Sequence, residues 1–152
     1  MRYSGTCQLL GIAPKGKITH PEIAGASAIS DGTPLEPNHS HFVLVESAEW
    51  GGETGKMLEV TRALNGPIVA ILVNGGAIAA DEALQSVRNG WRLFVIEGSG
   101  RFADELSAAV RDGQLATSVE AGEIARSGCV TLFHVDGTVE KLRDELRRML
   151  CS

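Results

Sequence analysis

The sequence predicts an α/β sandwich, in which helices cover both faces of a mainly parallel sheet of about five strands. Short, continuously apolar runs are typical of strands that are covered on both faces. From about residue 42 onward, these runs alternate with segments whose apolar residues recur at helical spacing. Such alternation is the chain order of an α/β sandwich. The 152 residues, 43% of them hydrophobic, suit one domain over residues 1–152.

Five apolar runs are the expected strands. They occupy residues 9–13, 42–45, 68–73, 93–96 and 129–135. The segment between the first two runs breaks the alternation, because residues 14–40 are rich in Pro, Gly, Ser and His. This segment is too long for a simple connection, and long loops in compact domains usually serve a function or move.

Four helices are expected from apolar stripes, each stripe being the face that packs against a sheet. The stripes lie within residues 57–64, 80–87, 102–110 and 139–149. A fifth, shorter helix is expected to begin at Thr117, because Thr117 to Glu120 fits a capping box. We expect it to end near Gly128, a residue type that often follows a helix.

Charge and composition exclude several classes of function. The net charge of −5 and the pI of about 5.3 do not fit a nucleic-acid-binding surface. The longest apolar run, residues 68–73, is too short to span a bilayer, and residues 1–5 do not resemble a secretion signal. Cys7, Cys129 and Cys151 match no metal or redox spacing. We therefore expect free thiols in a cytoplasmic protein that binds neither nucleic acid nor membrane.

Glycine-rich loops follow three of the expected strands, and each loop leads into an expected helix. In a parallel sheet these loops lie at the carboxyl edge, where α/β folds bind ligands. Each loop also presents helix-terminal amides and a positive dipole end, which suit phosphate or pyrophosphate. The loops are Trp50-Gly51-Gly52-Glu53-Thr54-Gly55, Asn74-Gly75-Gly76 and Gly98-Ser99-Gly100-Arg101.

Arg101 is the strongest candidate for contact with an anion. Its guanidinium could form a bidentate clamp on phosphate. The alternative is a surface arginine that pairs with Asp104 or Glu105, two acids in the first turn of the same expected helix. The loop does not match the dinucleotide fingerprint GxGxxG, and no phosphate-loop lysine is present.

Other candidates lie near the first glycine loop. His39 and His41 fall on one face of the expected strand, where they could bind a metal, bond a ligand or serve the fold. Trp50 could stack on a base or cover the core edge. Glu53 and Glu59 are the acid/base candidates, although Glu53 could instead cap a helix. No Ser-His-Asp or Cys-His arrangement is evident.

Four segments occur in this order: residues 35–42, 50–54, 73–76 and 98–104. Together they resemble the prokaryotic LSDAT family of the SLOG superfamily. The same domain forms the N-terminal region of melastatin-type TRP channels. The resemblance implies a Rossmann-like, three-layer sandwich that recognises nucleotides or nucleotide-derived ligands. In the channels the related region looks like an ADP-ribose-binding module.

The resemblance also implies which residues contact the ligand. Gly98, Ser99, Gly100 and Arg101 would lie on a phosphate or ribose. The rest of the cleft would be formed by Asn74, Gly75, Gly76, His39, Trp50, Gly51, Glu53 and Thr54. Full members begin with a further strand and a Gly-Gly-Thr-type loop, which this chain lacks. We therefore expect a shortened member or one completed by a partner, with an open strand edge that favours a homodimer.

Three functions follow as expectations. The first is a non-catalytic sensor that binds a nucleotide or an ADP-ribose-like ligand. The second is a nucleotide hydrolase of the phosphoribohydrolase (LONELY GUY) type, because Gly51-Gly52-Glu53 with Glu59 loosely resembles the glycine-rich loop of those enzymes. The third is an assembly domain with a decayed site.

Overall fold

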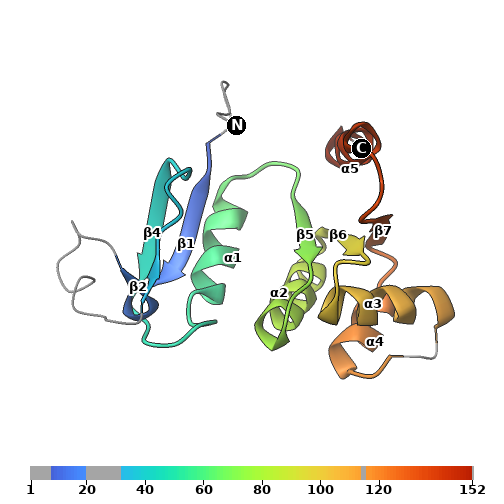
Figure 1. Cartoon of the computed structure of the whole chain (residues 1–152), viewed down its shortest axis with the longest axis horizontal. Coiled ribbons are helices and arrows are strands. Elements are labelled where there is room, and N and C mark those ends of the chain that lie inside the picture. Colours follow the sequence, from blue (N-terminus) through green and yellow to red (C-terminus); the bar gives the residue numbers. More distant parts are fainter. Residues whose placement is uncertain (1–7, 20–31, 114–115, 152) are drawn as a thin grey trace. The chain divides into compact units, whose positions relative to one another are not determined.

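The computed structural model describes residues 8–19, 32–113 and 116–151 (Figure 1). The chain forms two compact units, residues 1–64 and residues 65–152. Each unit is described by itself below. Cys7 and residues 20–31 of the long loop lie outside the described residues.

The first unit is built around a parallel pair of strands. Gly11 lies beside Phe42 in this pair, and a Cβ atom at position 11 would come within 2.6 Å of the Phe42 ring. The long loop contributes short regular pieces on either side of the residues that are not described. The elements are β1 (Leu10–Pro14), η1 (Lys15–Lys17), β2 (Ile18–Thr19), β3 (Thr33–Pro34), β4 (His41–Val45) and α1 (Thr54–Ala63); β1 pairs with β4, and β2 with β3.

The second unit is a parallel three-stranded sheet in the order β5-β6-β7, with helices on both faces. Figure 1 shows α5 on one side of the sheet and α2 and α3 on the other. The elements are β5 (Val69–Val73), α2 (Ala77–Arg88), β6 (Arg92–Glu97), α3 (Arg101–Asp112), α4 (Val119–Arg126), β7 (Val130–His134) and α5 (Val139–Cys151).

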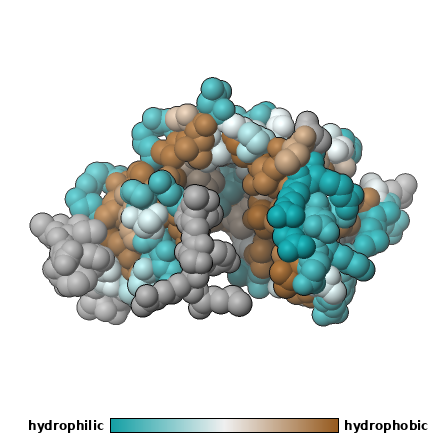
Figure 2. Space-filling view, turned by 90° about the horizontal axis from the view of Figure 1, so that it is seen from above, coloured by the Kyte–Doolittle hydropathy of each residue, from teal (hydrophilic) through white to brown (hydrophobic). Residues whose placement is uncertain are grey.

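The core of the second unit explains why its central strand is continuously apolar. Leu93, Phe94 and Val95 of β6 are at most 1% exposed, because helices cover both faces of this strand. On one face, Leu93 and Val95 belong to a cluster with Leu106 of α3 and residues of α2 and α4. Helix α5 is amphipathic, and its outer surface in Figure 2 is hydrophilic.

The predicted fold class is confirmed, since all five apolar runs form strands, four of the five α-helices that the structure describes follow the predicted stripes, and every described strand pairing is parallel. The five strands are hydrogen-bonded as a pair and a triplet. One continuous sheet and one single domain therefore stay predictions. Cys129 and Cys151 are free thiols. Within the described ranges, no helix has the length and apolarity needed to cross a bilayer.

The shorter helix begins later than the sequence indicated. Ser118, not Thr117, is the N-cap of α4, and its Oγ accepts the amide hydrogen of Ala121 at 3.2 Å. Three residues beyond Ser118 stands an alanine, which has no side chain to return a bond, so the reciprocal capping box does not form. The predicted end near Gly128 is confirmed, since Ser127 is the C-cap and Gly128 has a φ of 71°.

An ion pair ties the end of β6 to α3. The two carboxylate oxygens of Glu97 accept bonds from Nε and Nη2 of Arg111, both at 2.7 Å. This fork-like arrangement is the strongest geometry for such a pair. The bonds from Arg111 lower the pKa of Glu97 below its ordinary value of 4.5.

We predict that Leu106→Ala lowers the free energy of unfolding by about 2–5 kcal/mol, because it opens a cavity in a closely packed core. Leu106 is 0% exposed. Urea unfolding measures the change. The matched control is Val119→Ala, at a residue that is 79% exposed, for which we expect a change within about 0.5 kcal/mol. Equal midpoints for wild type and Leu106→Ala would contradict the packing described.

We predict that Glu97→Gln makes stability less sensitive to acid. A carboxylate whose pKa is lowered by folding contributes stability above its unfolded pKa, and loses it as the pH falls through the folded pKa. Between about pH 5 and about pH 3, the wild type should therefore lose more stability than the variant. Arg111→Gln should flatten the profile in the same way, because it removes the same ion pair. Parallel profiles for the three proteins would argue against this pair.

Candidate functional site

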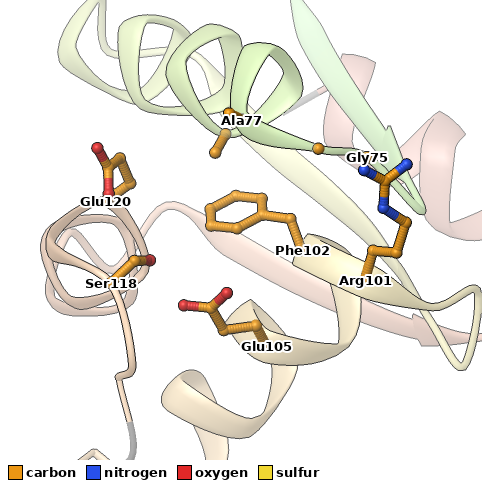
Figure 3. Close-up of a pocket in the computed structure, with 9 residues that line it drawn as sticks. Gly75, Ala77, Arg101, Phe102, Glu105, Ser118 and Glu120 are labelled. Atoms are coloured by element: carbon orange, nitrogen blue, oxygen red, sulfur yellow. The ribbon is translucent and has the colours of Figure 1, made fainter.

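The candidate site is a cavity of about 460 Å³ in the second unit, bordered by α2, α3 and α4 (Figure 3). Its volume falls within the range of roughly 300–1,000 Å³ that is usual for small-molecule sites. Three of the predicted site residues, Gly75, Gly76 and Arg101, line it. The other lining residues are Ala77, Ala80, Phe102, Glu105, Ser118 and Glu120.

Hydrogen bonds join the glycine loops that follow β5 and β6. The Ser99 hydroxyl accepts the amide hydrogen of Asn74 at 2.7 Å and donates to the Ile96 carbonyl at 2.6 Å. The amides of Phe102 and Ala103, in the first turn of α3, donate to the carbonyls of Gly75 and Asn74 at 3.3 and 2.9 Å. The prediction that these two loops lie together is confirmed. The same bonds use the hydroxyl hydrogen of Ser99 and two first-turn amides of α3.

The second of these loops has an unusual backbone. Gly98 and Gly100 have φ values of 84° and 101°, which glycine adopts without a steric penalty. Arg101 also has a positive φ, 49°, which costs a residue with a Cβ atom free energy. Asp104 closes the loop, since its Oδ1 accepts the Gly98 amide hydrogen at 2.7 Å. The protein therefore also uses the Gly98 amide.

The start of α2 differs from that of α3, where Phe102 and Ala103 donate their amide hydrogens to the protein. Gly76 is the N-cap of α2, and it has no side chain to accept a bond from the first turn. The first helical bond of α2 runs from the Ala80 amide to the Gly76 carbonyl at 2.9 Å. Within the described ranges, the amides of Ala77, Ile78 and Ala79 make no hydrogen bond. They form the positive end of the helix dipole, and Ala77 lines the cavity.

Arg101 reaches the cavity beside this helix start (Figure 3). A Cβ atom at position 76 would lie 2.8 Å from Nη2 of Arg101, so the glycine leaves room for the guanidinium. The Asp104 carboxylate accepts the Gly98 amide hydrogen and does not pair with the Arg101 guanidinium. No ion pair joins Arg101 to Asp104, Glu105 or another described residue. The alternative of a paired surface arginine is therefore not found among these residues.

The other end of the cavity carries oxygen acceptors. In Figure 3 the Glu105 carboxylate points toward Ser118, and the Phe102 ring lies between these groups and Ala77. Hydrogen bonding of the carboxylate to Ser118, and then to Thr117, lowers the pKa of Glu105. Its Oε1 atom is nonetheless buried without a well-formed hydrogen bond to a described residue. An ionised carboxylate oxygen without a donor is costly in a folded protein.

Sequence reasoning missed Phe102, Ser118 and Glu120 as site residues and considered Glu105 only as a partner for Arg101. One signal was available, because Arg101 and Glu105 are four residues apart and so lie on the same face of a helix. Ser118 and Glu120 gave no such signal, since only the packing of α4 against α2 and α3 brings them to the cavity.

The remaining candidates lie in the first unit. His39 packs on Phe42 with ring centroids 5.4 Å apart, and its Nδ1 is buried without a partner in the described chain. Nδ1 of His41 lies 2.9 Å from Oγ of the neighbouring Ser40. Trp50 is 46% exposed. Among the described residues, no three His, Cys, Asp or Glu side chains gather closely enough to hold one metal ion.

The two acid/base candidates differ in their surroundings. Glu53 occupies the N-cap position of α1 and is 8% exposed, yet its side chain makes no capping bond there. Its Oε2 is buried without a partner among the residues that the structure covers. Glu59 is exposed and pairs with Lys56 at 2.5 Å. That Glu53, with Gly51, Thr54, Trp50 and His39, shares a cleft with Arg101 stays a prediction.

Comparison with known proteins agrees with the resemblance. The family model described as "SLOG in TRPM, prokaryote" matches residues 1–143. The transient receptor potential cation channel subfamily M member 2 of mouse and that of rat are each 29% identical over 90 residues, which is 49% of this chain and 6% of the channel. The chain thus spans a small fraction of these relatives. Because the family match extends over most of its residues, the protein belongs to the prokaryotic LSDAT family of SLOG domains.

Proposed function

We propose that the protein binds a nucleotide-derived ligand of the ADP-ribose type, without chemical turnover, and that the ligand's phosphates occupy the cavity beside Arg101. One observation carries the proposal. The guanidinium of Arg101, which makes no ion pair with the described residues, lies beside the unbonded first-turn amides of α2. Both groups are donors that find no acceptor among the described residues, and a phosphate supplies several acceptor oxygens at once.

The energetics favour an anion at this point. Hydrogen bonds to a charged partner contribute about 1.5–3 kcal/mol each, which is more than neutral bonds contribute. The positive end of the α2 dipole adds a favourable field within the first turn. Glu97, the acid nearest along the chain to this loop, is neutralised by Arg111. The end of the cavity beside Arg101 is therefore suited to an anion, although Glu105 and Glu120 line the cavity further from Arg101 and the whole chain carries a charge of −5.

The family supports the nucleotide class. The family resemblance implies that the domain recognises nucleotides or their derivatives. The cavity has the volume of a small-molecule site. Phe102 and Ala80 give it an apolar floor between the polar groups.

A hydrolase is the second candidate, because one observation favours it. The carboxylate of Glu53 is buried and its Oε2 has no partner among the described residues, so this oxygen is unused by the described part of the protein. The other candidate acid, Glu59, is exposed and paired, and so does not support catalysis.

We predict that Arg101→Ala weakens ADP-ribose binding about 10- to 100-fold, the equivalent of the charged hydrogen bonds that it removes. Isothermal titration calorimetry measures the affinity. The affinity of Arg101→Lys should fall between those of wild type and Arg101→Ala, since lysine keeps the charge but not the forked guanidinium.

The matched control is Arg126→Ala, at an exposed arginine that does not line the cavity. Both alanine variants should keep their stability within about 0.5 kcal/mol. Unchanged affinity in Arg101→Ala, or no binding of any nucleotide by the wild type at millimolar concentration, would overturn the proposal.

We predict that AMP, ADP-ribose and NAD stay intact during prolonged incubation with the protein. Chromatography of the mixtures separates the nucleotides from free base and ribose phosphate. Release of either product, and its loss in Glu53→Gln, would establish the hydrolase instead. Release that persists in Glu53→Gln would indicate a contaminating enzyme.

A further inference from the structure

We propose that Glu105 and Ser118 form a hydroxyl-recognising pole of the cavity, so that the ligand is a sugar phosphate bound by its sugar hydroxyls as well as by its phosphate. This inference rests on the proposed function, since it concerns the same cavity. It assigns a role to residues that neither the glycine loops nor the family motif singled out.

The first step is the unmet hydrogen-bonding capacity of Glu105. Its Oε1 atom is buried and has no hydrogen-bond partner among the described residues, although the residue lines an open cavity. A buried carboxylate oxygen in this condition needs a donor, because leaving it without one costs the full desolvation penalty. Because Glu105 lines the cavity, a ligand that enters it brings donor groups to this carboxylate.

The second step is the protonation state of the carboxylate. Hydrogen bonding of the carboxylate to Ser118, and then to Thr117, holds the pKa of Glu105 below its usual range, and Oε1 is the oxygen that has no partner of ordinary geometry. The group is therefore ionised at neutral pH, and an ionised carboxylate only accepts hydrogen bonds. A phosphate oxygen cannot fill this position, because it is an acceptor with a negative charge. The occupant must donate, as the hydroxyl groups of a sugar do.

The third step is the separation between the two poles. Arg101 and Glu105 are one helical turn apart on the same face of α3, which is about 6 Å along the helix axis. In Figure 3 the guanidinium lies on one side of the Phe102 ring, and the Glu105 carboxylate lies toward Ser118 on the other. A phosphate and the ring hydroxyls of one pentose phosphate can bridge such a span. The apolar ring then lies under the carbon skeleton of the sugar.

Ser118 supports the carboxylate from the start of α4. Its Oγ accepts the Ala121 amide hydrogen at 3.2 Å, which fixes the hydroxyl at the cavity wall. Ser118 itself lines the cavity. The serine therefore holds the acceptor pole in position, and it offers a second oxygen within the same wall.

The test compares a ligand that has sugar hydroxyls with one that has none, namely ADP-ribose and inorganic pyrophosphate. In Glu105→Gln we expect about tenfold weaker binding of ADP-ribose, because the charged acceptor is lost. Pyrophosphate should bind as tightly as to wild type or more tightly, because a negative charge has been removed. A matched control, Glu140→Gln on the exposed start of α5, should leave both affinities within twofold.

A second pair of ligands tests the hydroxyls directly. Wild type should prefer ADP over 2′,3′-dideoxy-ADP about tenfold, and Glu105→Gln should reduce that preference to less than threefold. If Glu105→Gln weakens both ADP-ribose and pyrophosphate equally, or neither, the hydroxyl pole is wrong. Thermal unfolding of the variant identifies a folding defect, and Glu105→Asp then serves as the second variant, for which we expect the ADP preference to be intermediate.

The outcomes separate this inference from the proposed function. Failure of every phosphate ligand to bind the wild type would overturn both. Binding that depends on Arg101 but not on Glu105 would overturn the hydroxyl pole alone.

Discussion

The candidate site depends on the hydrogen bonds that fasten the loop after β5 to the start of α3. The Ser99 hydroxyl accepts a hydrogen bond from the Asn74 amide, and two amides of α3 donate to the carbonyls of Asn74 and Gly75. These bonds fix the backbone at Gly75 and thereby the direction in which α2 begins. Without them, Arg101 and the free amides of α2 would belong to two loops that move independently.

The same bonds determine which of the two helix starts can meet a ligand. In the first turn of α3 the amides of Phe102 and Ala103 are bonded to the protein, and Asp104 uses the amide of Gly98. Helix α2 keeps its amides because Gly76 offers no capping side chain. The cavity thus takes its positive character from the backbone of one helix and a side chain of the next. Its negative character comes from Glu105, one turn further along α3.

Much of this arrangement could be predicted from the sequence. Strands such as residues 93–96 are continuously apolar because helices cover both their faces, and that pattern is local. The meeting of the loops at Gly75 and Gly100 also follows, since parallel neighbouring strands end at the same edge. Arg101 could be named for the same reason.

The rest depends on contacts that no local pattern encodes. Which amides stay free is decided by bonds between Ala103 and Asn74, residues far apart in the chain. The place of Ser118 depends on the packing of α4. That helix begins one residue later than the sequence predicted, because Ser118 rather than Thr117 caps it. An acceptor that has no donor, such as Oε1 of Glu105, can be identified only when the positions of all neighbouring groups are known.

The positive φ of Arg101 has a consequence for how this position can change. Glycine here would relax the backbone and stabilise the fold, but it would remove the cation from the cavity. Stability and ligand recognition therefore pull position 101 in opposite directions, a trade-off known for strained functional residues. Variants selected only for heat resistance would be expected to drift toward glycine at this point and lose the anion site without unfolding.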